Sequence, residues 1–197
     1  MKIHDISQEV FSCAVYPGDP APEKRTLCDM QNGELYNLTA FSMCAHNGTH
    51  VDAPRHFIAD GKGVDEISLS SFVGLAYVAE REGEIFAEDA NEILQMAKSA
   101  KNGAEKRILI KGGAVVTAAA AEACAAAKTL LIGVEGQTVG PENAPMQVHK
   151  ILLGAGAVLL EGVRLRAVGE GACFLSAAPL NLGGADGAPC RAYIIEL

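Results

Sequence analysis

Eight short runs of β-prone residues recur along the 197-residue sequence, and they constrain its fold more than any other feature. Valine, isoleucine, leucine and tyrosine dominate these runs, and glycine or proline bounds most of them, which is the pattern of short strands. The runs are KIHDIS, NLTAFSMC, GLAYVAE, RILIK, TLLIGV, AVLLE, CFLSAAP and RAYIIEL. We therefore expect a mostly β core.

Three segments are typical of helices. Residues 87–103 and 144–156 end in glycines, which suit a C-cap. Residues 117–128 are rich in alanine and begin at Thr117, a residue type favoured at an N-cap. Strand signals alternate with helical ones between the last two of these segments, whereas strands follow strands elsewhere. This mixture predicts an α/β or α+β fold, with a mixed sheet and a few covering helices.

Length and composition are those of an ordinary globular protein. With 49% hydrophobic and 20% charged residues, the chain fits a single domain over residues 1–197 and can bury a substantial core. Residues 16–36, YPGDPAPEKRTLCDMQNGELY, are turn-rich and polar, and we expect them to form a loop or an arm.

Charge and cysteine usage argue against several classes of protein. A net charge of −8 disfavours a general affinity for nucleic acid or for an anionic membrane. The N-terminal MKIHDISQEV has no apolar signal region, and no run approaches the length of a membrane span. The six cysteines lie far apart without a C-x-x-C pair, which supports neither a zinc ribbon nor a disulfide framework. We expect a cytoplasmic protein.

Three of the five histidines lie within residues 45–57, AHNGTHVDAPRHF, together with an aspartate. A flat strand would place His46 and Asp52 about 20 Å apart at about 3.3 Å per residue, which is too far for one ion to bridge. Gly48 and Pro54 interrupt any helix here. The segment must therefore curl, and Gly48 is where it can do so. Curling would gather four side chains of the same parity: His46, His50, Asp52 and His56.

The residue types of this segment favour a metal site. Neutral imidazoles and carboxylates suit Zn²⁺, Mn²⁺ or Fe²⁺ without any thiolate. Asn47 and Thr49 could supply hydrogen bonds that fix the orientation of the imidazoles. A histidine-rich loop can also be an incidental surface feature, but three histidines and an aspartate around a glycine turn favour metal binding.

The two remaining histidines have different surroundings. His4 lies in an alternating run and has no partner nearby except Asp5, so we interpret it as structural. His149 lies in a helical segment followed by an apolar run that ends in Glu161. A carboxylate at the end of a buried strand needs a partner, and the sequence leaves two open: a metal ion, or an arginine of the RLR tripeptide that follows.

The segment HNGTHVDAPRHF resembles the H-x-G-T-H-x-D-x-P-x-H-F signature of the cyclase-like metal-dependent hydrolases. That family includes bacterial kynurenine formamidase (arylformamidase) and isatin hydrolase. Three further segments resemble the family: HDISQEVFSCAVYPGDP, VHKILLGAGAVLLEG and PLNLGGADGAPCRAYII. The similarity covers nearly the whole chain and is least distinctive at about residues 85–130.

This resemblance implies a complete set of metal ligands. His46, His50 and Asp52 match the family's first ligand group. His149 and Glu161 match the second group. The implied cofactor is Zn²⁺, as one or two ions, or Mn²⁺, with Asp52 or Glu161 shared if two ions bind.

The resemblance also implies a reaction. His56 matches the histidine regarded as the general acid/base, and the implied activity is hydrolysis of a carbon–nitrogen amide bond in a small molecule. N-formylkynurenine is the leading substrate. The alternatives are hydrolysis of a cyclic amide such as isatin, the ring closure of a cyclase, or metal binding without catalysis. The implied fold is a swivelling β/β/α barrel-like domain, assembled as a homodimer or homotetramer.

One segment departs from the family's pattern. Where many relatives carry an aspartate, often followed by a serine, this chain has Glu135, Gly136 and Gln137. The departure leaves the ligands untouched, so it bears on the choice of substrate. Three aromatic residues are candidates for lining the substrate pocket: Phe11, Tyr16 and Phe57. Tyr16 and Phe57 are equally plausible as packing residues.

Overall fold

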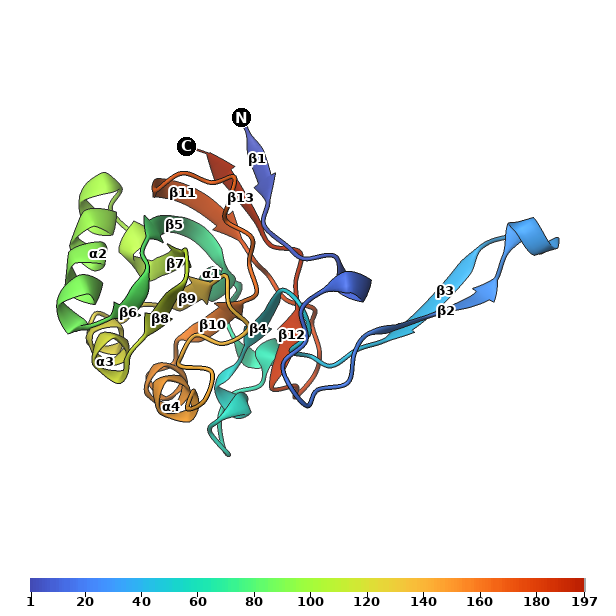
Figure 1. The fold of residues 1–197 in the computed structure, drawn as a ribbon, viewed down its shortest axis with the longest axis horizontal. Coiled ribbons are helices and arrows are strands. Elements are labelled where there is room, and N and C mark those ends of the chain that lie inside the picture. Colours follow the sequence, from blue (N-terminus) through green and yellow to red (C-terminus); the bar gives the residue numbers. More distant parts are fainter. Residues whose placement is uncertain (197) are drawn as a thin grey trace.

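The computed structural model describes residues 1–196 and shows a curled mixed sheet, a layer of helices and a long two-stranded arm (Figure 1). The predicted α/β fold, with a mixed sheet and covering helices, is confirmed. The last predicted strand and the single-domain prediction both extended to Leu197, which lies outside the described residues.

The main sheet of the described chain has nine strands and contains both parallel and antiparallel pairs. In spatial order they are β1 (Ile3–Asp5), β13 (Tyr193–Glu196), β11 (Gly171–Ser176), β5 (Val73–Glu80), β7 (Arg107–Lys111), β9 (Leu131–Val134), β10 (Val158–Glu161), β4 (His50–Asp52) and β12 (Gly187–Pro189). Strands β5, β7, β9 and β10 are parallel, and the strands on either side pair antiparallel. Each parallel crossover passes through a helix, as parallel pairs require.

Three helices cover one face of this sheet, and a shorter one precedes β5 (Figure 1). They are α2 (Ala87–Ala100), α3 (Ala118–Ala126), α4 (Met146–Gly154) and the short α1 (Leu69–Phe72). The predicted cap of α3 is confirmed, because Thr117 Oγ1 accepts a hydrogen bond from the Ala120 amide at 3.3 Å. The predicted end of α2 at Gly103 is wrong: the helix ends at Ala100, and Gly103, with φ +98°, precedes a separate short turn.

The central strands bury both of their faces. Ile108 and Ile110 of β7 pack toward the helices, whereas Leu109 between them belongs to a second core on the opposite face. This two-sided burial explains why RILIK is a continuous apolar run rather than an alternating one.

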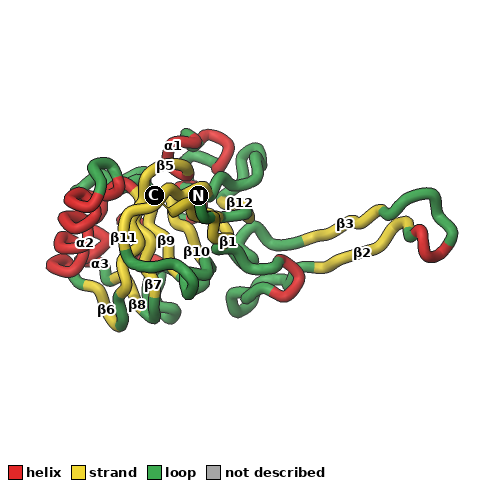
Figure 2. Tube along the Cα trace, turned by 90° about the horizontal axis from the view of Figure 1, so that it is seen from above, coloured by secondary structure: helices red, strands yellow, loops and turns green. Residues whose placement is uncertain are grey.

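The arm projects away from the body in both Figure 1 and Figure 2. It consists of β2 (Glu23–Cys28) paired antiparallel with β3 (Leu38–Ser42). The structure thus places a strand, β2, within residues 16–36, and the sequence prediction missed it because EKRTLC is mostly charged and polar. The arm exposes a set of large apolar side chains: Leu27, Met30, Leu35, Tyr36, Leu38 and Phe41.

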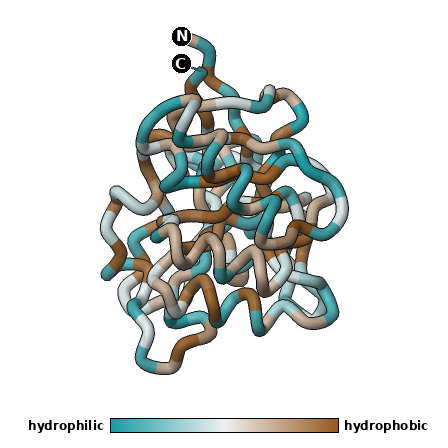
Figure 3. Tube along the Cα trace, turned by 90° about the vertical axis from the view of Figure 1, so that its left-hand side faces the viewer, coloured by the Kyte–Doolittle hydropathy of each residue, from teal (hydrophilic) through white to brown (hydrophobic). Residues whose placement is uncertain are grey.

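The helical side of the molecule faces the viewer in Figure 3, where hydrophilic and hydrophobic residues are interspersed along the chain. In a second small sheet, β6 (Gly83–Ile85) pairs parallel with β8 (Ala114–Val116); β6 leads into α2 and β8 into α3. Among residues 1–196, the structure has no helix that is both long and apolar enough to cross a membrane.

Candidate metal centre

The pairing of β4 with β10 joins the two predicted ligand groups. His50 is the register partner of Glu161, and Asp52 is the partner of Leu159. Directly opposed residues on antiparallel strands share a face, and so do residues two apart on one strand. The side chains of His50, Asp52 and Glu161 therefore all point to the helix-covered side of the sheet, while Val51 packs into the opposite core.

His46 reaches the same place because the chain curls before β4. Gly48 has φ +65°, and a Cβ there would lie 2.8 Å from Cys13 Cβ, so the predicted curl at this glycine is confirmed. The curl brings His46 Nδ1 within 2.8 Å of Asp52 Oδ1.

Asn47 and Thr49 stabilise this curl rather than the imidazoles. Asn47 Oδ1 accepts from the Cys44 amide at 2.8 Å, and Thr49 Oγ1 donates to the Gly162 carbonyl at 2.8 Å. The expectation that these two side chains orient the ligand histidines is therefore wrong: they hold the backbone of the loop.

His149 is supplied by α4, which lies over the end of β10 (Figure 1). Its Nε2 is 3.2 Å from Glu161 Oε1 and 3.5 Å from Asp52 Oδ2. The four central residues are nearly inaccessible, with exposed fractions of 1–3% for His50, Asp52, His149 and Glu161. Five predicted ligands from three distant parts of the chain thus converge on one buried point.

Each of the three ligand histidines has its outward nitrogen held by an acceptor. Nδ1 of His50 lies 3.1 Å from the Gly48 carbonyl, and Nδ1 of His149 lies 2.9 Å from the Pro145 carbonyl. Nε2 of His46 lies 2.8 Å from a carboxylate oxygen at the entrance to the site. With an N–H donated outward, the other nitrogen of each ring turns its lone pair toward the carboxylates, as in protein metal sites.

The donor atoms form two adjoining groups. Asp52 Oδ1 and His50 Nε2, 3.4 Å apart, belong with His46, while Asp52 Oδ2 and Glu161 Oε1 face His149. Within each of the groups His46–His50–Asp52 and Asp52–His149–Glu161, the donor atoms lie within 4.8 Å of one another. Asp52 Oδ2 is buried with no hydrogen-bond partner among the described residues. Nitrogen and carboxylate donors around such an orphaned oxygen fit a divalent cation.

The electrostatics of the cluster favour positive charge. Burial alone would lower the pKa of His50, but the carboxylates of Asp52 and Glu161 outweigh it and raise the pKa to about 10. Burial also opposes protonation of His149, yet the same carboxylates raise its pKa to about 10. Burial would raise the pKa of Asp52, but the adjacent imidazoles of His149, His46 and His50 hold it well below its usual range. The carboxylates therefore attract protons on the imidazoles, or a metal cation that replaces those protons.

His56 stands on the open side of the cluster. It belongs to a short 3₁₀ turn (Pro54–His56) that follows β4, and 28% of its side chain is exposed. Its ring stacks on that of His46 at 4.1 Å between centroids, and its Nε2 lies 4.0 Å from Asp52 Oδ2. A histidine in this position can exchange protons with a molecule held at the ligands.

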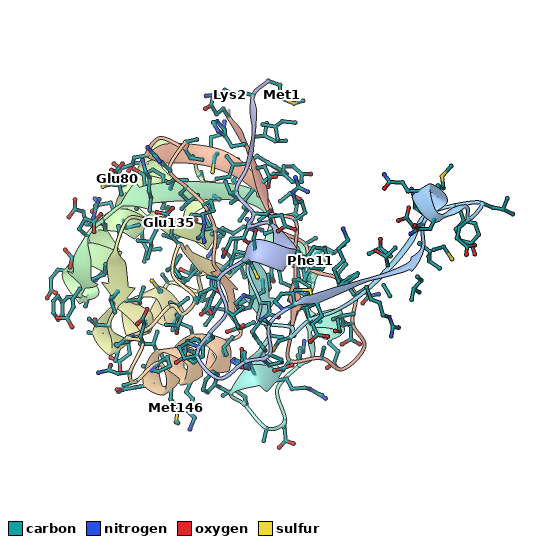
Figure 4. All side chains as sticks on the ribbon, turned by 45° about the vertical axis from the view of Figure 1, so that its right-hand side comes forward. Met1, Lys2, Phe11, Glu80, Glu135 and Met146 are labelled. Carbon is teal, nitrogen blue, oxygen red and sulfur yellow. The ribbon has the colours of Figure 1, made fainter. Side chains whose placement is uncertain are left out.

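The three aromatic candidates lie in different places. The Phe57 ring is 4.7 Å from the His149 ring and so borders the cluster. Phe11 lies on a 3₁₀ turn beside the base of the arm (Figure 4) and lines a cavity of about 1030 Å³. Tyr16 donates a hydrogen bond to the Glu142 carbonyl at 3.1 Å. Of the three, the structure brings Phe57 to the ligand side chains.

In the segment that departs from the family's pattern, residues 135–137, the first residue, Glu135, has a structural role. The Glu135 carboxylate accepts from the amides of Gly112 at 2.9 Å and Leu165 at 2.8 Å, which ties three stretches of chain together. The Arg164 guanidinium donates to the Glu135 carbonyl at 3.3 Å. The amide nitrogen and oxygen of Gln137 are buried without a partner among residues 1–196.

Glu161 has the partners that a buried carboxylate requires. They are His50, His149 and the Val139 amide, which donates to Glu161 Oε1 at 2.9 Å. The arginine alternative for Glu161 is therefore wrong.

His4, interpreted as structural, has its Nε2 2.6 Å from Glu196 Oε1 at the β1–β13 end of the sheet, well away from the ligand groups in the strand order.

Sequence reasoning missed Asp186. This residue precedes β12, and its Oδ2 lies 2.8 Å from His46 Nε2 and 3.2 Å from His56 Nδ1. Burial would raise the pKa of Asp186, but its hydrogen bonds with the two imidazoles hold that pKa below its usual value. The available signal was the aspartate in the segment GGADGAP, which carried the resemblance without an assigned role.

Comparison with known proteins places this geometry in a family. Residues 4–140 match the family model described as "Putative cyclase". The kynurenine formamidase of Salinibacter ruber is 31% identical over 210 residues, which cover 98% of this chain and 97% of that protein. Other kynurenine formamidases match at similar identity.

Solved structures share the fold. A protein described as a predicted metal-dependent hydrolase from Bacillus stearothermophilus aligns with a TM-score of 0.80 at 26% identity, covering 98% of this chain and 97% of that one. Isatin hydrolase A from Labrenzia aggregata aligns with a TM-score of 0.83 at 21% identity, covering 99% and 93% of the two chains, and this likeness concerns the fold. The chain therefore belongs to the cyclase family, as a hydrolase related over its whole length to the kynurenine formamidases.

Proposed function

We propose that this hydrolase is a metal-dependent arylformamidase that cleaves the carbon–nitrogen amide bond of an N-formylated aromatic amine, with N-formylkynurenine as the leading substrate. The observation that carries the proposal is the convergence of five nitrogen and carboxylate donors, with His56 beside them, at one point of the fold. The relatives that match over the full chain support the choice of a formamide.

We assign the metal site to the two adjoining donor groups. One ion would be held by His46, His50 and Asp52, and a second by Asp52, His149 and Glu161, with Asp52 shared. Zn²⁺ and Mn²⁺ both suit imidazole and carboxylate donors. A divalent ion bound there would supply Lewis acidity, polarising a substrate carbonyl and acidifying a water molecule.

The chain's own residues provide the remaining chemistry. In formamide hydrolysis the oxygen of water bonds to the formyl carbon and the carbon–nitrogen bond breaks, releasing formate and the free amine. One proton must therefore pass from the water to the departing nitrogen. His56 is placed to carry it, because its Nε2 faces the ligand cluster and its side chain is partly open to solvent. Phe57 offers an aromatic surface next to His149 for the ring of the substrate.

The direct test is the rate of N-formylkynurenine hydrolysis by purified protein supplied with Zn²⁺ or Mn²⁺, with bound metal quantified in the same sample. We expect turnover that a chelator abolishes. Bound metal without turnover would contradict the substrate assignment and retain the site.

Isatin hydrolysis is the second candidate. It rests on the departure at residues 135–137, where Glu135, Gly136 and Gln137 stand in place of the aspartate that many relatives carry, and where the buried Gln137 side-chain amide has no partner among residues 1–196. Supplying isatin in the same assay separates the two reactions, because a cyclic amide opens to one product whereas a formamide releases formate.

We also propose that a second copy of this chain covers the arm, giving a homodimer or a homotetramer built from such dimers. An isolated two-stranded ribbon is marginally stable in water, and this one exposes Leu38 and Phe41 to 42% and 57%. The same chain offers an apolar cavity at the arm's base, lined by Phe11, Phe41 and Leu180. In a two-fold dimer each arm could cover the other copy's cavity, because the same patch serves both subunits.

Sedimentation velocity tests this assembly. We expect at least twice the mass of one chain for the natural protein and dissociation for Leu38→Ser. The control is Leu69→Ser, which removes from the body a leucine that is 66% exposed, more than Leu38. A monomeric natural protein would contradict the assembly. The cytoplasmic location and the lack of nucleic-acid and membrane partners stay predictions.

A further inference from the structure

Asp186 has side-chain contacts that the ligand groups do not explain. Its Oδ2 lies 2.8 Å from His46 Nε2 and 3.2 Å from His56 Nδ1. Among the other residues of the described chain, these two imidazoles are the groups that form hydrogen bonds with the Asp186 carboxylate. The side chain is 45% exposed, so it lies at the entrance of the site rather than among the buried donors.

The loop that carries Asp186 is held without this carboxylate. The Asp186 carbonyl accepts from the Ala53 amide at 2.9 Å, and the Ala185 carbonyl accepts from the Val64 amide at 2.9 Å. The Gly184 amide donates to Asp65 Oδ1 at 2.8 Å. Backbone hydrogen bonds and the Asp65 carboxylate thus hold this loop in place. The Asp186 side chain is not needed for that role.

The register of β12 explains how this aspartate reaches both rings. Gly187 pairs with Asp52 across β12 and β4, so residue 186 is adjacent to the end of the strand from which His56 follows. The approach is close: a Cβ at Gly187 would lie 2.7 Å from His46 Cε1. The carboxylate is therefore positioned over the edges of two stacked imidazoles.

We propose that Asp186 is the positioning residue of His56, holding its ring with the Nδ1–H toward Asp186 Oδ2 and the Nε2 lone pair toward the substrate. An ionised carboxylate only accepts hydrogen bonds, so the nitrogen facing it carries the proton. His56 Nε2 is thereby left as the acceptor on the ligand side, 4.0 Å from Asp52 Oδ2. Without Asp186 the ring can adopt the other tautomer, which presents a proton where a base is needed.

The shared oxygen couples the two rings. Because Asp186 Oδ2 contacts both His46 and His56, the acid/base histidine keeps a fixed position relative to a metal-ligand histidine. Their rings stack at 4.1 Å with an interplanar angle of 29°. A displacement of His56 by about 1 Å is enough to cost a large factor in rate.

The kinetic test is a double-variant cycle on the metal-loaded protein, and it rests on the proposed formamide hydrolysis. Asp186→Ala should lower kcat about 10–100-fold, the range typical of residues whose hydrogen bonds orient the histidines of a metal site, with a smaller change in KM. The same substitution in a His56→Ala background should change kcat by less than about twofold, since there is no imidazole left to orient. Equal losses in both backgrounds would overturn the proposal.

A second readout needs no substrate. The imidazole nitrogen chemical shifts of His56 in zinc-loaded protein, measured at about pH 8.5 where an ordinary imidazole is neutral, report which nitrogen carries the proton. We expect the Nδ1–H form in the natural protein and a mixture in Asp186→Ala. An unchanged tautomer would overturn the proposal, whereas inactivity toward formamides with the expected tautomers would overturn only the proposed function.

Two controls separate positioning from other roles. Asp65→Ala removes the neighbouring carboxylate that ties the same loop, and a loop effect would make it as damaging as Asp186→Ala. His46, His56 and Asp186 also lie close enough to hold an ion, so bound metal is counted in each variant. We expect the metal content of Asp186→Ala to match that of the natural protein. Loss of an equivalent would make Asp186 a ligand and contradict the proposal.

Discussion

His50 and Glu161 stand opposite each other on adjacent antiparallel strands, with His50 Nε2 3.4 Å from Glu161 Oε2. This single register pair joins a ligand group near the N-terminus to one more than a hundred positions later. A slip of β4 by one residue against β10 would turn His50 to the opposite face of the sheet from Glu161. The metal site therefore depends on the strand register of β4 and β10.

The two donor groups predict separable metal binding. His149→Ala removes one donor from the second group and leaves His46, His50 and Asp52 in place. We expect it to bind about one equivalent less metal than the natural protein and to lose activity about 10²-fold or more. Elemental analysis of the metal-to-protein ratio checks this. A complete loss of metal would show that the two groups bind a single ion.

Metal binding should stabilise the fold through Asp52. The buried Asp52 Oδ2 has no hydrogen-bond partner in the described chain, and a cation would satisfy it. A metal present at about a hundred times its Kd adds about 2.7 kcal/mol to the free energy of unfolding. We expect added Zn²⁺ to raise the Tm of metal-stripped protein and Asp52→Asn to abolish that rise. An equal rise in both proteins would place the stabilising metal elsewhere.

We expect His56 to be required for turnover but not for metal binding. It belongs to neither of the two donor groups that share Asp52, and its partly exposed side chain stands on their open side, with Nε2 4.0 Å from Asp52 Oδ2. His56→Ala should lower kcat about 10²–10⁴-fold at unchanged metal content. Parallel measurements of rate and bound metal decide the matter, since a joint loss would make His56 a ligand.

Gly187 should be sensitive to substitution. A Cβ there would lie 2.6 Å from the Val51 carbonyl oxygen and 2.7 Å from His46 Cε1, so Gly187→Ala must displace β12 or the His46 ring. We expect a loss of about 2 kcal/mol or more in the free energy of unfolding, together with weaker metal binding. Gly169→Ala is the matched control, because a Cβ there meets nothing within 4 Å. Denaturant unfolding of both variants should separate them clearly, and similar stabilities would contradict the packing described.

The sequence was most informative where one local property decides the structure. RILIK predicts β7 because a strand buried on both faces must be apolar throughout. By contrast β4 and β12 have three residues each, with the sequences HVD and GAP, and their place depends on tertiary pairing: β4 pairs with β10, and β12 pairs with β4. The polar β2 was missed for a related reason, since its exposed residues carry no hydrophobic pattern.

In the candidate site, too, some features follow from the local sequence and others depend on tertiary contacts. The curl at Gly48 follows from local geometry and from the reach of a metal–ligand bond. The joining of His149 and Glu161 to that loop is a tertiary contact, and only the family resemblance indicated it. Asp186 contacts His46 across 140 positions of sequence, and no local pattern marks such a contact.

The most direct test of the account restores metal stepwise to metal-stripped protein while N-formylkynurenine hydrolysis is followed. We predict no hydrolysis without metal and a rate that rises until about two equivalents of Zn²⁺ or Mn²⁺ have bound, as the two donor groups around Asp52 require. Full hydrolysis by the metal-stripped protein would contradict the central claim that these donors form a catalytic metal centre.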